Sequence, residues 1–155
     1  GGLGAPTILQ VVSTTKTDTF ATTSTTDVDV TGLSATITPR STSSKILVLV
    51  SAPFSTTTNQ INSITLTRGG TPIGGGTIVG SRTSAFKSAY LTSVNTGGML
   101  SGEHLDSPST TSSITYQVQA KTSAGTMTIG ISGGDSNAAN HPRTSSTITL
   151  MEVAG

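Results

Sequence analysis

The sequence predicts an all-β fold, an antiparallel β-sandwich of about ten short strands. Three observations support this prediction. The chain contains 32 Thr and 23 Ser in 155 residues, and β-branched threonine suits a pleated, half-buried surface. Aliphatic and polar residues alternate in short segments that turn residues separate. Gly, Ser and Thr also interrupt every window that is long enough to hold a helix.

The first half of the chain contains five predicted strands. Lys45–Phe54 is apolar on both faces, which predicts a central strand that is covered on each side. Gly32 is expected to end one strand before the next begins. Gly69 and Gly70 can supply the positive φ of a hairpin turn. The five segments are Thr7–Ser13, Thr26–Thr31, Leu33–Thr38, Lys45–Phe54 and Gln60–Arg68.

The second half contains five more predicted strands, separated by a loose loop at Gly74–Gly76 and a longer polar loop at Gly133–Pro142. The first and last strands of the chain are apolar, or nearly so, on both faces. We expect them to lie side by side in the sheet interior, near a subunit contact. The five segments are Phe86–Ser93, Met99–Leu105, Ser113–Thr122, Thr126–Ser132 and Ser146–Ala154.

Glu152 interrupts the alternation of the last strand, because it is in phase with apolar Ile148 and Leu150. We expect the strand register to break at Glu152 or the strand end to be open to solvent. The alternative is a pair with a cation across a subunit interface, for which Lys45 and Arg40 are candidates.

Composition limits the classes of function. Residues 1–155 suit a single domain, and a chain that begins with Gly1 is expected to be a piece of a longer one. Net charge is +1 and the basic residues are scattered, so we predict no nucleic-acid partner. The apolar run Ile46–Val50 is too short for membrane insertion. Aromatic residues make up 3% of the chain, so burial between subunits is expected to supplement a small core.

One motif suggests catalysis. Gly130–Gly134 fits the G-x-S-x-G pattern of hydrolases around Ser132, and Asp135 and His141 follow in the order of a triad. That pattern requires a helix after the serine, and no helix is predicted there. Ser132 and Asp135 are also too close in sequence for a triad that the fold assembles. We therefore interpret the segment as a glycine-rich loop and predict that the chain is not an enzyme.

Two pairs of side chains are candidate metal ligands. Glu103 and His104 are adjacent, so a strand would point them to opposite faces. Asp27 and Asp29 share one face of a predicted strand and could bind calcium together with loop carbonyls. Solvent-facing carboxylates are the plainer interpretation, and we predict neither a bound metal nor a cofactor.

Loops are the expected place for ligand contact. The longest polar loop carries Asn137, Asn140, His141 and Arg143, and Tyr90 is one of the few aromatic residues. An aromatic plane together with amide and charged groups suits sugar recognition. These five residues are the candidate ligand contacts.

Six segments that span nearly the whole chain carry a family resemblance. They are Ile8–Thr19, Asp29–Pro39, Ser41–Val48, Leu66–Ile73, Leu105–Thr111 and Thr144–Ala154. Together they resemble C-terminal modules of tail-fibre-like proteins of bacteriophages, those of marine phages and cyanophages especially. The resemblance implies that the chain belongs to a virion and takes part in attachment to host cells. It identifies no binding residue.

A second, looser resemblance concerns the fold. A strand that ends in Arg68–Thr71 and continues into Pro72 and Ile73 looks like the strand and turn of tumour-necrosis-factor-like jelly rolls. This resemblance implies a jelly-roll-like sandwich. It also implies a homotrimer in which the first and last strands are adjacent near the three-fold axis.

These observations lead to one functional prediction and two alternatives. We predict the C-terminal head of a phage tail fibre, which binds a host surface glycan or protein through weak contacts that are multiplied by avidity. Its other partners would be copies of itself and other virion proteins. A capsid-decorating or fibre-forming structural subunit is the first alternative. A carbohydrate-binding domain of a secreted cellular protein is the second.

Overall fold

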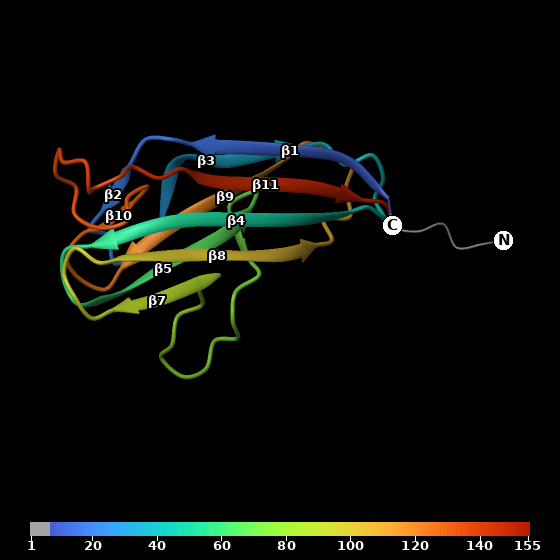
Figure 1. Cartoon of the computed structure of the whole chain (residues 1–155). Helices are drawn as coiled ribbons and strands as arrows, with labels where there is room; N and C mark the ends of the chain where they lie inside the picture. Colours follow the sequence, from blue (N-terminus) through green and yellow to red (C-terminus); the bar gives the residue numbers. More distant parts are fainter. Residues whose placement is uncertain (1–6) are drawn as a thin grey trace.

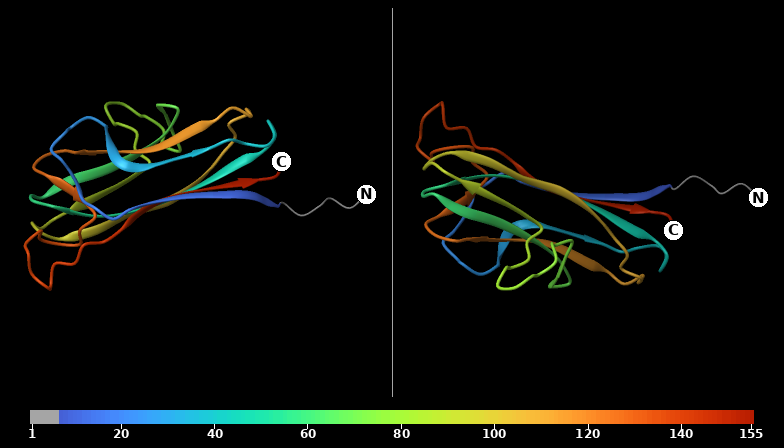
Figure 2. Two further views of the ribbon diagram at one scale, coloured as in Figure 1. Left: turned by 90° about the horizontal axis from the view of Figure 1, so that it is seen from above. Right: turned by 90° about the horizontal axis from the view of Figure 1, so that it is seen from below.

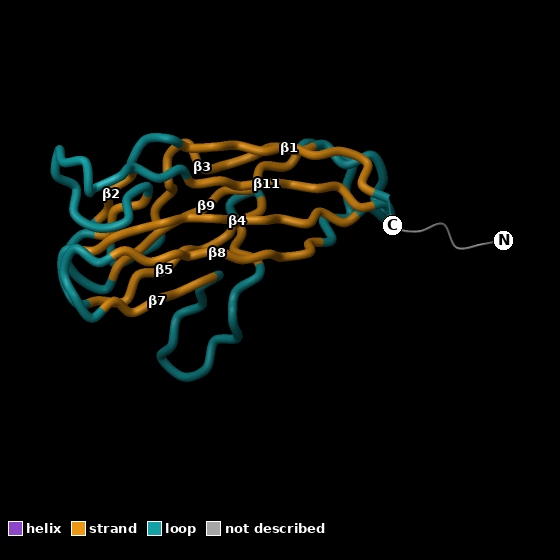
Figure 3. Tube along the Cα trace, in the orientation of Figure 1, coloured by secondary structure: helices purple, strands orange, loops and turns teal. Residues whose placement is uncertain are grey.

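A computed structural model describes residues 7–155. These residues form eleven strands and no helix, as Figures 1 and 3 show. No helix capable of crossing a membrane is therefore found in this part of the chain. The strands build two antiparallel sheets that pack face to face, which confirms the predicted all-β sandwich (Figure 2).

Sheet A contains six strands. β1, β11, β4 and β8 lie side by side in that order, and β2 and β10 continue β1 and β11 at one end (Figure 1). β4 is central, because β8 pairs with one edge and β11 and β10 share the other. The bounds are β1 (Ile8–Lys16), β2 (Phe20–Thr22), β4 (Lys45–Thr56), β8 (Gly97–Asp106), β10 (Met127–Ile129) and β11 (Ser146–Val153).

Sheet B contains the other five strands. β3, β9 and β5 lie in that order, and β6 and β7 share the far edge of β5. Counting the interrupted strands as one, each sheet has four positions and the chain crosses repeatedly between them, which is the arrangement of a jelly roll. The bounds are β3 (Val28–Ile37), β5 (Gln60–Arg68), β6 (Thr71–Ile73), β7 (Lys87–Leu91) and β9 (Ile114–Thr122).

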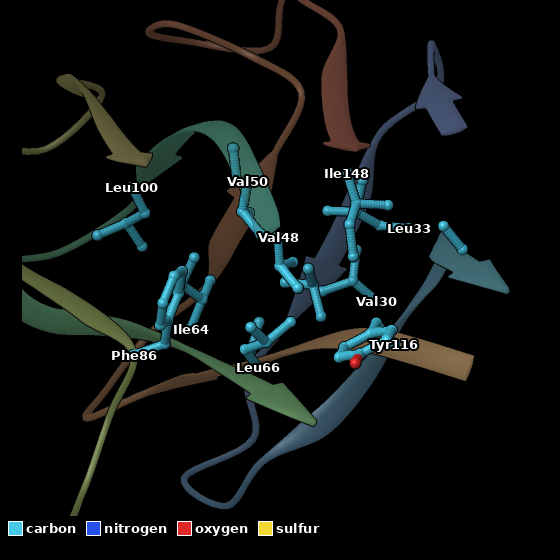
Figure 4. Close-up of a cluster of buried hydrophobic side chains, with 14 of the residues drawn as sticks. Val30, Leu33, Val48, Val50, Ile64, Leu66, Phe86, Leu100, Tyr116 and Ile148 are labelled. Atoms are coloured by element: carbon cyan, nitrogen blue, oxygen red, sulfur yellow. The ribbon is translucent and has the colours of Figure 1, made fainter. Parts of the chain in front are cut away.

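The core lies between the sheets and consists mostly of aliphatic side chains. Inward residues alternate with outward ones along β4, β9 and β11, so each strand contributes every second residue. Figure 4 shows Val48, Leu66 and Tyr116 among the side chains that meet there. Phe54 and Tyr116 are the largest fully buried side chains.

Three strand predictions need correction. Gly32 does not separate two strands: β3 continues past it, with Gly32 at φ +81° and an irregular register between Asp29 and Ser34. The outer face of β4 is only half-buried at Leu47 and Leu49, so this strand is not covered on both sides. β1 pairs with β11 as expected, but it lies at the edge of sheet A and not in its interior.

Two short strands were not predicted. β2 and β6 have three residues each, and pairing with other strands defines both of them. β2 pairs with β10. β6 returns from β5 through the Gly69–Gly70 turn, where φ is +55° and +83°, as the hairpin prediction required.

The register does not break at Glu152. Gln10, Glu152, Ile46 and Asp106 form one inward-facing row across sheet A, after an irregularity in β1 between Ile8 and Gln10. The Glu152 side chain is fully buried and accepts hydrogen bonds from the Gln10 amide and from the backbone N–H of Arg40, at 2.5 and 2.6 Å. Arg40 therefore does contact Glu152, but through its backbone and within one chain.

The second carboxylate of that row belongs to a network that joins the two sheets. Asp106 is 6% exposed. It accepts two hydrogen bonds from Arg68 at 2.8 and 2.9 Å and one from the Tyr116 hydroxyl at 2.6 Å. Burial, and then the hydrogen bond to Asp106, raise the pKa of Tyr116 well above its usual range.

Candidate functional site

The polar loop between β10 and β11 leaves one end of sheet A and returns to it within a short distance. Gly130 begins the excursion with φ +90°. The backbone N–H of Thr144 donates to the Gly130 carbonyl at 2.9 Å, and Ile131 bridges Arg143. A side chain at residue 130 would approach the Asp18 carbonyl to 3.0 Å, so glycine is required on both grounds. The loop is thus anchored at a narrow base.

A polar hollow of about 340 Å³ lies within this loop. Three of the predicted contact residues, Asn137, His141 and Arg143, line it. Asn140 is exposed on the same loop but does not line the hollow. The structure therefore brings together three of the four loop candidates. The complete lining is Asp135, Ser136, Asn137, Ala138, His141 and Arg143.

Hydrogen bonds and one ion pair hold this lining in place. The Arg143 guanidinium lies 2.8 Å from the Asp135 carboxylate and donates to the Thr19 hydroxyl at 3.2 Å. His141 Nδ1 is hydrogen-bonded to the Ser136 hydroxyl. The Arg143 and Asp135 side chains are 56% and 45% exposed, so solvent screens their attraction. The hollow offers donors and acceptors to a polar ligand such as a sugar, without an apolar floor.

Tyr90 does not belong to this hollow. It lies on β7, at the edge of sheet B, and is 59% exposed. Its partner across the strand pair is Ile61, which is also half-exposed at 49%. The two form a small apolar spot on a different sheet from the loop. The expected combination of an aromatic plane with the loop amides is therefore not assembled within one chain.

The side chains of the hydrolase-like motif make other contacts. His141 is hydrogen-bonded to Ser136 and not to Ser132. Asp135 is ion-paired with Arg143. Ser132 is exposed, and the residues after Gly134 form bends and turns in place of the helix that the motif requires. Ser132, His141 and Asp135 therefore do not form the hydrogen-bonded series of nucleophile, base and orienting carboxylate that a triad requires.

The candidate metal ligands either bind other side chains of the protein or lie on opposite faces of a strand. Asp27 accepts from the Thr65 hydroxyl at 2.9 Å and lies 3.2 Å from the Lys121 ammonium. Asp29 accepts from the Gln119 amide at 2.8 Å. On β8, Glu103 faces outward and is exposed, whereas His104 faces the sheet interior opposite Val48. Within residues 7–155, no three His, Asp or Glu side chains are grouped to hold an ion.

A second hollow, of about 350 Å³, was not predicted from the sequence. It lies between the outer face of sheet B and the loop that follows β6. Lys121 links the two, since it pairs with Asp27 and donates to the Ser84 carbonyl at 3.4 Å. Ile78 is part of the lining and remains 64% exposed. The sequence feature that could have indicated this hollow is the apolar pair Ile78 and Val79 inside a Gly- and Ser-rich loop.

Comparisons with known proteins give a likeness of fold. No protein-family model matches the chain, and no curated protein matches it in sequence. A structure of T=1 particles derived from infectious bursal virus aligns with a TM-score of 0.49 and 17% identity, over 97% of this chain and 38% of that chain. A structure of infectious bursal disease virus, Gx strain, aligns with a TM-score of 0.45 and 18% identity, over 93% and 39%. The chain thus spans less than half the length of either.

Proposed function

We propose that the chain is a non-enzymatic structural module of a virus particle, which assembles with copies of itself and with other virion proteins. The observation that carries this proposal is the filled jelly roll. Its interior is occupied by packed side chains such as Val48, Leu66 and Tyr116, and the two hollows described above lie on the surface. Jelly rolls of this kind serve as viral capsid and lectin domains.

The sequence supports the same proposal independently of the fold. Six segments resemble phage tail-fibre-like modules, and all six include parts of strands that build the sandwich. A chain in which 10% of the residues are charged and Ser and Thr are abundant makes surface contacts that depend little on salt. Such a surface suits a particle that must stay assembled in varied media.

The test is the location of the protein. Particles purified from a lysate should contain the chain in many copies, as measured by quantitative mass spectrometry. Gold-labelled antibody should then place it either on the capsid or along a tail or fibre. Recovery of the protein in the particle-free secreted fraction, or a coding gene among cellular secretion genes, would contradict the proposal and favour a cellular carbohydrate-binding domain.

A second candidate is the finer function expected from the sequence, adhesion by a tail-fibre head. The specific observation that favours it is the polar hollow that Asn137, His141 and Arg143 line at the tip of a projecting loop. Single contacts there would be weak. Copies arranged in a homotrimer and repeated over several fibres would bind a host glycan or protein through avidity.

This candidate predicts binding that depends on the loop. The chain displayed in many copies on beads should adhere to host cells and to glycan arrays. Asn137→Ala and His141→Ala should reduce adhesion about tenfold or more, because each removes hydrogen-bonding groups that repeat in every copy. Asn59→Ala, on another exposed loop, is the matched control. Unchanged adhesion of both loop variants would remove the hollow as the binding site.

A further inference from the structure

The outer face of sheet A carries an apolar row that becomes visible in the register of its strands. Val11 lies opposite Met151, Met151 opposite Leu47, and Leu47 opposite Leu105. These four residues, the apolar row, cross all four strands that lie side by side in Figure 1. Val11 and Leu105 at its ends are 55% and 50% exposed, and the two residues between them are half-buried.

Neighbouring positions extend the apolar row along the strands. Leu49 follows Leu47 on the outer face of β4, and Ile8 and Val153 pair at the terminal side of the row. Ile8 is 48% exposed. Contiguous apolar surface of this kind, with polar residues around it, marks an interaction site in soluble proteins.

The outer face of sheet B is built differently, which shows that the row is not a general property of this fold. Outward residues of β5 are polar at Ser63, Thr65 and Thr67, and the apolar spot of Ile61 and Tyr90 is confined to one end of the strand. Thr65 is nevertheless only 5% exposed, because the loop that carries Ile78 lies over it. Sheet B thus covers part of a mostly polar face with its own chain, whereas sheet A leaves an apolar row uncovered by residues 7–155.

Charges on this face indicate which partner fits it. Lys45 lies on β4 on one side of the apolar row, and Glu103 lies on β8 on the other side, opposite Leu49. Both are exposed, and neither takes part in an ion pair among residues 7–155. One positive and one negative group on opposite sides of an apolar line make the face complementary to itself.

We propose that the outer face of sheet A is a self-association surface, on which two copies pack face to face about a two-fold axis along the apolar row. Each row residue then packs near its own counterpart. Lys45 of each copy comes within one strand spacing, about 4.8 Å sideways, of Glu103 of the other. Isologous contacts of this type are the commonest in homo-oligomers.

The size of the face agrees with a dimer of modest affinity. Four strands at about 4.8 Å spacing and a length of about 30 Å give roughly 600 Å² per copy. Two copies would bury roughly 1,200 Å², which is the lower limit for specific interfaces. The inference goes beyond the proposed function, since a sandwich that forms dimers need not belong to a virus particle. The dimer is an alternative to the homotrimer of the tail-fibre-head candidate.

The experiment measures the solution mass of the chain by sedimentation equilibrium between about 1 and 500 µM, a range that covers weak interfaces. The mass should rise from the 15.5 kDa of one chain to twice that value. Val11→Lys and Leu105→Lys should keep the chain monomeric over this range with unchanged circular dichroism. Val94→Lys is the matched control, because Val94 is a valine of similar exposure, 57%, outside sheet A.

A charge exchange tests the two-fold geometry. Lys45→Glu and Glu103→Lys alone should each weaken the dimer about tenfold, since each turns two attractions into repulsions. The double variant should restore the affinity of the original chain. A wild-type mass that stays at one chain, or equal effects of Val11→Lys and Val94→Lys, would overturn the surface. A trimeric mass, or failure of the double variant to restore affinity, would overturn the two-fold arrangement. Neither outcome would affect the location test above.

Discussion

Two polar clusters at opposite ends of the sandwich differ in burial. At the end where β11 finishes (label C in Figure 1), Glu152 and Asp106 point inward on either side of Ile46 and are satisfied by partners from other elements. At the opposite end, the loop of residues 130–144 holds Asp135 and Arg143 in a half-exposed pair. Removing one partner of a buried polar group is destabilising, because the other partner is left buried and unpaired, whereas exposed pairs are screened by solvent and contribute little.

This comparison predicts that single substitutions have unequal effects at the two ends. The largest effect is expected for Asp106→Ala, which leaves the Arg68 guanidinium and the buried Tyr116 hydroxyl without their acceptor. We expect the free energy of unfolding to fall by about 3 kcal/mol, near the lower value for breaking a buried pair, since Arg68 is partly exposed. Urea denaturation measures it, and a loss of under about 0.5 kcal/mol would contradict the assignment.

A smaller loss, and a change in pH dependence, are expected for Glu152→Gln. Burial alone would raise the pKa of Glu152, but hydrogen bonds from Gln10 and the Arg40 backbone outweigh it, and that pKa lies below its usual 4.5. The charged form is therefore favoured by folding. At neutral pH the variant should lose about 1–2 kcal/mol, because an amide replaces an acceptor with a donor.

The sign of the pH effect follows from linkage. A carboxylate whose pKa is lowered by folding stabilises the protein fully above the unfolded pKa, and this contribution disappears as pH falls through the folded pKa. The original chain should therefore lose stability below pH 4.5, and the difference from Glu152→Gln should shrink there. Urea denaturation at a series of pH values measures it. A difference that stays constant from pH 7 to about 3 would show that Glu152 is not charged in the fold.

The local alternation of apolar and polar residues was sufficient to predict the strands of the core. It also placed the Glu152 side chain on the inward face, where the structure has it. What the sequence could not provide was the identity of the donors. Gln10 is 142 residues away, and the Arg40 contribution is a backbone N–H. With no visible partner, a register break was the reasonable prediction, and it was wrong. Strand pairing, which is non-local, supplied the answer.

The same limit applies to the surface features. The polar loop was predicted as the place of Asn137, His141 and Arg143, because composition marks loops. The apolar row was not, since Val11, Met151, Leu47 and Leu105 come from four strands and become neighbours only through register. The sequence did indicate the apolar row in one place, because Lys45–Phe54 is apolar on both faces. That pattern was interpreted as a strand covered on each side.

A third variant, Tyr116→Phe, separates the contribution of the tyrosine hydroxyl to the Asp106 network from that of Arg68. It removes the hydroxyl that donates at 2.6 Å but keeps the ring in the core and the Arg68 pair intact. We expect a loss of about 1 kcal/mol, the net value of one hydrogen bond. Because Asp106 keeps Arg68, the loss should be clearly smaller than that of Asp106→Ala. Equal losses in urea denaturation would mean that the tyrosine, and not the ion pair, fixes this end.

The smallest effect is expected at the loop end. Arg143→Ala removes the pair with Asp135 and the hydrogen bond to Thr19, and both lie in a half-exposed setting. Because solvent already screens this pair, the free energy of unfolding should change by less than about 0.5 kcal/mol. The small difference that exists should vanish at high salt. A loss comparable to that of Asp106→Ala would show that the loop is part of the stabilising structure, and the two ends would then differ in exposure alone.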